Sequence, residues 1–186
     1  MDDTVILDLY WARSESAINE TAIKYSKYCN TIAMNILRSN EDADECVNDT
    51  YLKAWNAMPP ERPSILSSFL GKITRNLSLN RYKEQRTKKH GGGEVALLLD
   101  ELADCVPSAV SVEAEAEAKT IAEAISAFLR SVGATERVVF VRRYWYADPI
   151  AAIALRLSMS ESRVKSMLFR TRNKLREYLE KEGLTL

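Results

Sequence analysis

The sequence has few of the residues that build metal sites, tight turns or membrane spans. Its 3 cysteines and 1 histidine are widely spaced, whereas a closed zinc site usually takes four such ligands, so we expect no metal and no other cofactor. With 6 glycines and 5 prolines in 186 residues, an all-β fold rich in tight turns is disfavoured. No apolar run approaches the ~18 residues of a membrane span, and the acidic start Met1–Asp3 lacks the basic segment of a signal peptide. The expected location is therefore cytoplasmic.

The formal net charge is +0, but the charged residues are unevenly distributed along the chain. Residues 71–90 carry seven basic side chains and one acidic one, and residues 128–186 carry twelve and six. The segments that precede these blocks, 1–70 and 91–127, are both acidic. Two basic blocks in a neutral chain indicate two separate surfaces that face phosphate groups, with acidic surface left for another partner.

Apolar residues recur at steps of three and four along nearly every long segment, which is the helical period. Three such segments precede Gly91, and their predicted inward residues are Ile18, Ala22, Tyr25, Cys29, Ile32, Ala33, Ile36 and Leu37; Ala43, Cys46, Val47, Tyr51, Ala54, Trp55 and Met58; and Leu66, Phe69, Leu70, Ile73 and Leu77. The acidic residues 91–117, which open on three glycines, are interpreted as a flexible linker. The predicted fold is all-α, with two small helical domains, 1–90 and 118–186.

The segment from Asp148 to Leu179 has the pattern of a helix-turn-helix. We expect Asp148 to cap a short helix, Ser158 to lie in the turn, and Ser160 to cap the second helix. Because serine tolerates a positive φ poorly, the turn is expected to be strained or differently shaped. The predicted inner face of the second helix is Val164, Leu168, Thr171, Leu175 and Leu179, and the outer or marginal residues are Arg163, Lys165, Ser166, Phe169, Arg170 and Arg172. A basic helix of this kind can enter the major groove of DNA.

Three segments resemble parts of bacterial sigma factors of the sigma-70 family. Residues Glu41–Trp55 resemble the second region of these proteins, and Phe69–Leu77 resemble the neighbouring promoter-reading segment. Residues Ser160–Arg172 resemble their C-terminal recognition helix. The layout of two blocks joined by a short linker is similar to the extracytoplasmic-function (ECF) type, which lacks the larger middle domain.

The resemblance implies an RNA polymerase specificity subunit that is not an enzyme. Its first domain would bind the clamp of core RNA polymerase and read the melted −10 element of promoter DNA, while the helix-turn-helix would read the duplex −35 element. An anti-sigma factor is a further partner that the family allows. The residues expected to read the −35 element are Ser160, Arg163, Lys165, Ser166, Phe169, Arg170 and Arg172, with Arg163 and Arg172 better placed for phosphates.

Two groups in the first domain have the chemistry that these roles need. A stripe at three- and four-residue steps, expected to read the −10 element, comprises Lys72, Arg75, Asn76, Asn80 and Lys83. A polar and mostly acidic helix face, expected to bind polymerase, comprises Asp42, Asp44, Glu45, Asn48, Asp49 and Lys53. Without the resemblance, the asparagines could be local caps and the acidic face a plain solvated surface.

Several alternatives remain open at this level. A stand-alone helix-turn-helix regulator would explain residues 135–180 but not the basic stripe, and an enzyme acting on nucleic acid would need a motif that the sequence does not contain. Phe169 could contact a thymine methyl group or pack inside the domain. Tyr51, Trp55 and Trp145 have the helical spacing of core residues rather than of base-stacking ones, and Trp11 fits no motif.

Overall fold

The computed structural model of the chain describes residues 1–88, 94–103, 105 and 114–184. It divides into two compact units, residues 1–91 and 92–186. The described residues form helices joined by turns and contain no strand, so the all-α prediction is confirmed. Each unit has its own buried apolar residues and is described below by itself.

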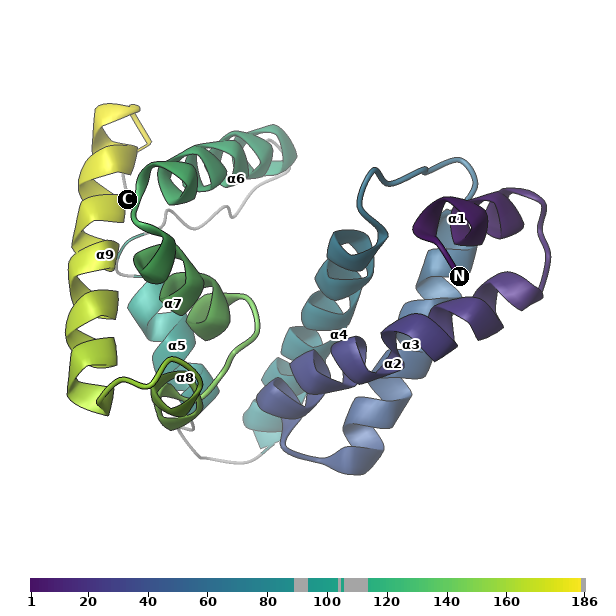
Figure 1. Cartoon of the computed structure of the whole chain (residues 1–186), viewed down its shortest axis with the longest axis horizontal. Coiled ribbons are helices and arrows are strands. Elements are labelled where there is room, and N and C mark those ends of the chain that lie inside the picture. Colours follow the sequence, from purple (N-terminus) through teal and green to yellow (C-terminus); the bar gives the residue numbers. More distant parts are fainter. Residues whose placement is uncertain (89–93, 104, 106–113, 185–186) are drawn as a thin grey trace. The chain divides into compact units, whose positions relative to one another are not determined.

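Unit 1 contains helices α1 (Asp3–Trp11), α2 (Ser16–Leu37), α3 (Asn40–Ala57) and α4 (Leu66–Lys88). Helices α2, α3 and α4 pack against one another, and α1 packs on α2 (Figure 1). The predicted inward stripe of α3 is buried except for Trp55, which is half-buried. In the first two turns of α2 the prediction is displaced by one residue, because Ala17 and Thr21 are buried where Ile18 and Ala22 were expected.

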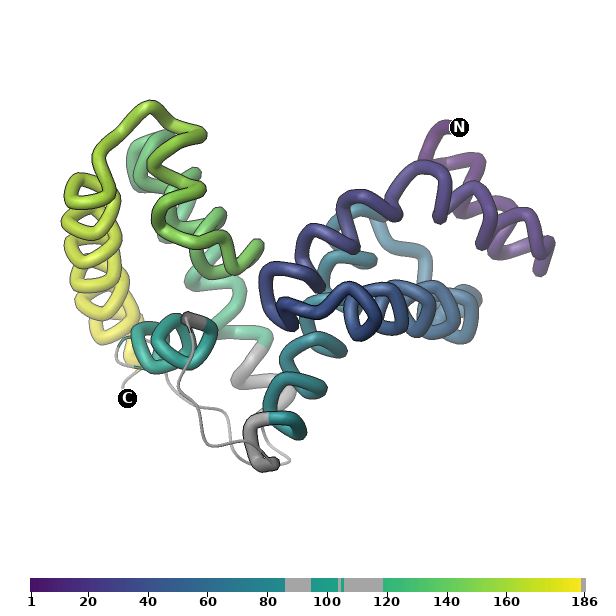
Figure 2. The backbone as a smooth tube through the Cα atoms, turned by 90° about the horizontal axis from the view of Figure 1, so that it is seen from below, coloured from purple at the N-terminus to yellow at the C-terminus, as the bar shows by residue number. Residues whose placement is uncertain are grey.

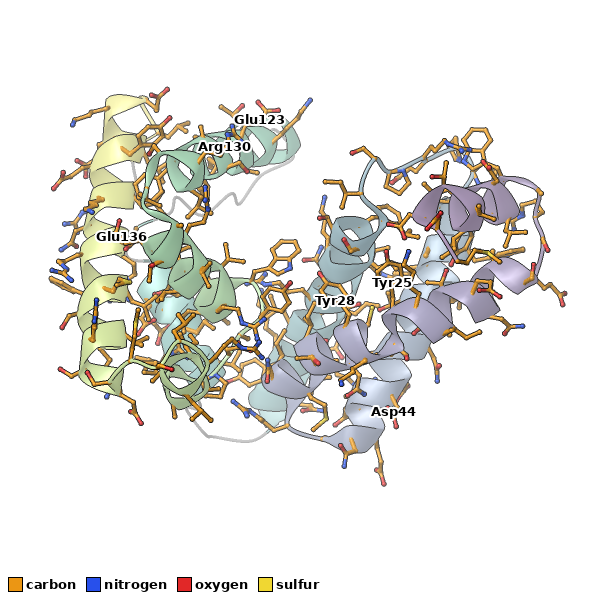
Figure 3. All side chains as sticks on the ribbon, viewed as in Figure 1. Tyr25, Tyr28, Asp44, Glu123, Arg130 and Glu136 are labelled. Carbon is orange, nitrogen blue, oxygen red and sulfur yellow. The ribbon has the colours of Figure 1, made fainter. Side chains whose placement is uncertain are left out.

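The buried side of α4 differs from the prediction. Phe69, Ile73 and Leu77 are only half-buried, and the buried residues that follow Leu70 in the described part of α4 are small, namely Gly71, Thr74 and Ser78. Small residues allow close approach to α2, where a Cβ atom at Gly71 would clash with the hydroxyl of Tyr28, which Figure 3 labels. Thr74 Oγ1 donates to the Leu70 carbonyl at 2.9 Å and accepts from Thr50 Oγ1 at 3.1 Å. Because the hydroxyls of Thr50 and Thr74 are satisfied inside the unit, burying these two groups is not costly.

Helix α1 has no counterpart among the predicted helices. It buries Ile6, Leu7 and Tyr10, and the Tyr10 hydroxyl lies 2.9 Å from Thr21 Oγ1 on α2. These contacts hold the N-terminal residues against the three-helix core. Trp11 at the end of α1 stays 43% exposed.

Unit 2 contains α5 (Glu94–Ala103), α6 (Ala114–Ser131), α7 (Ala134–Tyr144), α8 (Ile150–Arg156) and α9 (Glu161–Lys181). The chain turns sharply between α8 and α9 (Figure 2), and α9 packs against α6, α7 and α8. The five residues predicted for the inner face of the second helix are all buried, which confirms that face. Ser160 caps α9 as predicted, since its hydroxyl accepts a hydrogen bond from the Arg163 N–H at 3.2 Å.

Part of the predicted flexible linker is a folded helix. Helix α5 lies within residues 91–117, belongs to unit 2, and buries Val95, Ala96 and Leu98. At 10 residues, this helix is shorter than the windows over which a helical period is recognised. Residues 114–117 of the predicted linker also belong to a helix, since α6 begins at Ala114. Linker residues 91–93, 104 and 106–113 lie outside the described residues.

The expected cap of α8 is wrong. The carboxylate of Asp148 is buried and pairs with Arg142, at 2.6 Å from Nε and 2.5 Å from a terminal guanidinium nitrogen. Pro149 is the N-cap residue of α8, without a side-chain hydrogen bond. A carboxylate beside a helix start predicts a cap, and the sequence does not show that Arg142 reaches it.

Ser158 in the turn has φ of 52°, the left-handed conformation that favours glycine. A side chain in this region costs about 1–2 kcal/mol, part of which glycine loses again through its greater freedom in the unfolded chain. Ser158→Gly is therefore expected to raise the free energy of unfolding of unit 2 by about 0.5–1 kcal/mol, as measured by urea denaturation.

Ser162→Gly is the matched control for this prediction, because Ser162 is exposed in the first turn of α9 and has helical backbone angles. The same substitution there should lower the stability, since glycine is a poorer helix former. A urea concentration at the unfolding midpoint that is lower for Ser158→Gly than for the original protein would contradict the prediction.

Candidate nucleic-acid and polymerase interface

The N-terminal half of α9 presents most of the predicted −35 residues to solvent. Ser160, Arg163, Lys165, Ser166, Phe169 and Arg170 are exposed. Lys165 Nζ lies 3.9 Å from Glu161, one turn away, and both side chains are more than half exposed. Such a pair contributes roughly 0.5 kcal/mol or less, so Lys165 can exchange it for a stronger acceptor at little cost.

Phe169 does not pack inside the domain. Its side chain is 58% exposed on the outer side of α9. Of the two alternatives for this residue, the structure excludes burial in the core. An exposed aromatic ring between Lys165 and Arg170 is suited to apolar contact with a base edge.

Arg172 is not on the exposed side of the recognition helix. Its side chain is only 18% exposed, and Nη1 donates to the Tyr144 hydroxyl at 2.7 Å. The same nitrogen lies 3.5 Å from the Glu101 carboxylate on α5. Because Arg172 is bound inside unit 2, the expectation that it contacts phosphate is corrected.

In unit 1, four of the five stripe residues on α4 are exposed: Lys72, Asn76, Asn80 and Lys83. Their three- and four-residue steps place them along one side of the helix. Arg75 is half-buried, and burial lowers the pKa of its guanidinium. Arg75 is therefore not exposed together with the other four residues, which corrects its expected place in the stripe.

A pocket of about 520 Å³ lies where the end of α3, the following loop and α4 meet. Ala57, Phe69 and Ile73 give it an apolar wall, and Lys72 and Asn76 are polar groups at the same wall. The other lining residues are Lys53, Asn56 and Glu61. The half-buried Phe69 and Ile73, predicted for the core, instead line this pocket. Such a mixture of apolar surface and a few polar groups suits a flat polar ligand such as a nucleotide base.

The predicted polymerase-binding face on α3 is largely exposed, as seen for Asp44, Glu45, Asn48, Asp49 and Lys53. Asp44, labelled in Figure 3, accepts a hydrogen bond from Asn30 at 3.1 Å. Glu45 pairs with Arg81 of α4. These contacts leave most of the acidic face open to a basic partner.

Asp42 is the exception on this face. It is half-buried and bound to α4 through Gln85 at 3.1 Å and Arg81 at 3.0 Å. Its hydrogen bonds with Gln85 and with Ser39, and the charge of Arg81, hold the pKa of the carboxyl below its usual value. Asp42 therefore joins α3 to α4, which corrects its expected place among the freely exposed residues.

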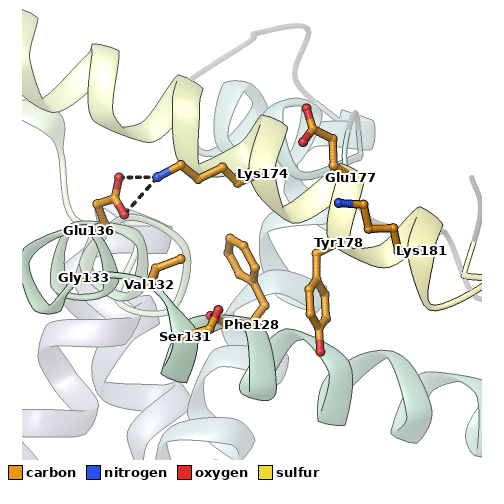
Figure 4. Close-up of a pocket in the computed structure, with 9 residues that line it drawn as sticks. All are labelled: Phe128, Ser131, Val132, Gly133, Glu136, Lys174, Glu177, Tyr178 and Lys181. Atoms are coloured by element: carbon orange, nitrogen blue, oxygen red, sulfur yellow. Dashed lines mark hydrogen bonds and ion pairs between the residues drawn. The ribbon is translucent and has the colours of Figure 1, made fainter.

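Unit 2 has another pocket, of about 390 Å³, beside the C-terminal half of α9 (Figure 4). Lys174 bridges one side of it to Glu136 at 2.9 Å, and Glu177 and Lys181 add one charge of each sign. Phe128 and Tyr178 form its aromatic surface. Because its charges are balanced, this pocket lacks the excess of positive charge that nucleic acid requires.

Other features of the described residues bear on what the chain can do. Cys29, Cys46 and Cys105 are buried free thiols, and no group of three or more His, Cys, Asp or Glu in this part of the chain could hold a metal ion. Among the described residues, no helix has both the length and the apolar character that crossing a membrane requires. Of the aromatic residues assigned to the core, Tyr51 is buried, whereas Trp55 and Trp145 are half-buried.

Two functional candidates were missed by the sequence analysis. Arg13 lies in the turn after α1, and its Nη1 donates to the Trp55 carbonyl at 2.8 Å and to the Met58 carbonyl at 3.1 Å. Glu101 lies in the predicted linker and binds side chains of α7 and α9. Neither residue belongs to a periodic stripe, so no local signal could have identified it.

Two family models match the chain in the order of the two units. The model described as Sigma-70 region 2 matches residues 24–88, and the model described as Sigma-70, region 4 matches residues 128–177. No curated protein matches the chain. A stand-alone regulator would leave the match over residues 24–88 unexplained. The chain therefore belongs to the sigma-70 family of transcription initiation factors, as a small ECF-like member with two domains that serve promoter recognition.

Proposed function

We propose that the chain binds core RNA polymerase and directs it to promoters by reading two DNA elements with two separate domains. The observation that carries this proposal is the presence of one exposed basic surface in each unit, on α4 and on α9. Neither domain belongs to a known enzyme family, and we propose that the chain catalyses no reaction itself and acts in the cytoplasm.

The α9 surface is suited to reading the duplex −35 element. Arg163, Lys165 and Arg170 supply positive charge for phosphates and base edges, and Phe169 supplies an apolar contact. Ser160 caps α9 and is exposed, and the N-terminus of a helix attracts a phosphate. Helix α8 supports this helix from the side, as in other helix-turn-helix proteins.

The α4 surface and its pocket are suited to the melted −10 element. The amide of Asn76 can donate to and accept from the edge of an unpaired base, while Lys72 holds the neighbouring phosphate. Phe69 and Ile73 offer the apolar surface on which an extruded base can rest. Asn80 and Lys83 continue the stripe along the strand.

The exposed face of α3 is the proposed contact with polymerase, since Asp44, Glu45 and Asp49 complement a basic helix. Such charged contacts mainly direct association and register, so single substitutions there are expected to have small effects. An anti-sigma factor that covers either domain would be a natural inhibitor of the proposed activity.

Replacing Asn76 and Asn80 by alanine tests the proposed division of labour. We expect the double variant to open promoters about thirtyfold less, because each of the two amides lost from a base contact costs about 1 kcal/mol. Duplex −35 binding should be unchanged. The measurement is permanganate footprinting of the melted region together with run-off transcription.

Asn19→Ala is the control for this prediction, because Asn19 is exposed on α2 outside the stripe. Equal losses of −35 binding and of promoter opening in the double variant would contradict the assignment of the two elements to different domains. Failure of the unmodified chain to bind core polymerase in a pull-down would overturn the proposal as a whole.

A further inference from the structure

The loop between α3 and α4, residues 58–65, forms part of the pocket proposed for a −10 base. Its Glu61 lines the pocket, next to Ala57 at the end of α3. The loop contains three prolines, so fewer of its backbone N–H groups can hydrogen-bond to neighbouring segments. Its position therefore depends on the side chains that bind it.

Arg13 binds the start of this loop. Its guanidinium donates to the carbonyls of Trp55 and Met58, and it stacks over the Trp55 ring at 4.0 Å from the centroid. The last carbonyls of a helix have no partner within the helix and carry partial negative charge. A guanidinium with its planar donors is well matched to two such carbonyls. Arg13 therefore holds the point where α3 ends and the loop departs.

Arg62 binds the middle of the same loop to α1. It forms an ion pair with Asp8 and lies over the Trp11 ring at 5.7 Å from the centroid. Both charged side chains are well exposed, so this pair is weak by itself. Together, Arg62 and Arg13 connect the loop at two points to residues 8–13. Trp11 contributes to this connection through its contact with Arg62.

The turn at Arg13 has a backbone conformation that is costly for a residue with a side chain. Arg13 has φ of 53°, a conformation that glycine or asparagine adopts more easily. Helix α1 is held in place by the buried Ile6, Leu7 and Tyr10, so this turn is a firm support. Residues 1–23 lie outside the part of the chain that matches Sigma-70 region 2.

We propose that Arg13 is a positioning residue that sets the base preference at the −10 element by holding loop 58–65, with Arg62 in a supporting role. This inference rests on the function proposed above. It assigns a specificity role to the N-terminal segment, which touches the loop and not the DNA.

The test compares Arg13→Gly with Arg38→Gly in the full chain with core polymerase. Both arginines have a left-handed backbone, with φ of 53° and 58°, but Arg38 is the C-cap residue of α2 and lies outside the turn that follows α1. Promoter opening is measured on a library randomised in the −10 element. For Arg13→Gly we expect the preference for the best base to fall about fivefold or more, with core binding and duplex −35 binding unchanged. Arg38→Gly should keep the original preference.

Arg62→Ala and Asp8→Ala keep the proposal testable if Arg13→Gly fails to fold, because both side chains are exposed. Each should shift the base preference in the same direction by about twofold. An unchanged preference in all three variants, or a loss of core binding equal to the loss of preference, would overturn the role of Arg13. If the unmodified chain opens promoters without any preference at the −10 element, the proposed function itself fails, which is a different result.

Discussion

Replacing both Lys165 and Arg170 by alanine is expected to lower the affinity for the duplex −35 element by about 2–6 kcal/mol, which is at least about thirtyfold. Each base contact made by a basic side chain in the major groove contributes about 1–3 kcal/mol. Both residues are exposed on α9, and Lys165 forms a weak ion pair with Glu161 that it can exchange for a contact with DNA. The measurement is fluorescence anisotropy with a labelled promoter duplex at fixed salt, alongside run-off transcription.

The control for this prediction is the double variant Lys174→Ala and Lys181→Ala. This variant also removes two positive charges from α9, but both lie at the pocket beside the C-terminal half of the helix. The affinity of this control for the −35 duplex should fall only through the loss of sequence-independent attraction to phosphates. This loss should be smaller at high salt. Unchanged transcription in the Lys165 and Arg170 variant, or equal losses in both double variants, would show that the two residues do not read bases.

Glu101→Ala is expected to lower the stability of unit 2 by about 3 kcal/mol. The Glu101 carboxylate accepts a hydrogen bond from the Tyr144 hydroxyl at 2.9 Å and lies 3.7 Å from Arg143 and 3.5 Å from Arg172. Arg143 is fully buried, so the substitution leaves a positive charge in the interior without this acid. Removing one partner of such a buried group is costly because the charge that remains has lost its solvation.

Hydrogen exchange of the full chain can measure this loss separately in unit 2. Amides of α5, α7 and α9 should exchange faster in Glu101→Ala, with those of unit 1 unchanged. Asp100→Ala is the matched control, since the neighbouring Asp100 is exposed, and it should change little. If the amides of α7 and α9 are equally protected from hydrogen exchange in the two variants, α5 does not stabilise the second unit.

These predictions differ in how far the sequence alone could support them. The outer residues of α9 were correctly assigned, because a strong 3.6-residue pattern on a long helix separates inside from outside. Arg172 was misplaced because it lies near the margin of that pattern, where contact with Tyr144 decides its direction. Arg75 was misplaced for a similar reason, since the packing of α4 against α2 depends on small residues that carry no hydrophobic signal.

The sequence by itself determined the all-α class, the two basic blocks, the Ser160 cap and the inner face of the recognition helix. These depend on local periodicity and capping, which act over a few residues. Only the tertiary structure decided that α5 joins unit 2 through Glu101, that Asp148 pairs with Arg142, and that Arg13 holds the loop after α3. Each of these depends on a charged side chain that binds a group on another element of the fold. How the helices pack determines such contacts, and the order of residues along a single helix does not.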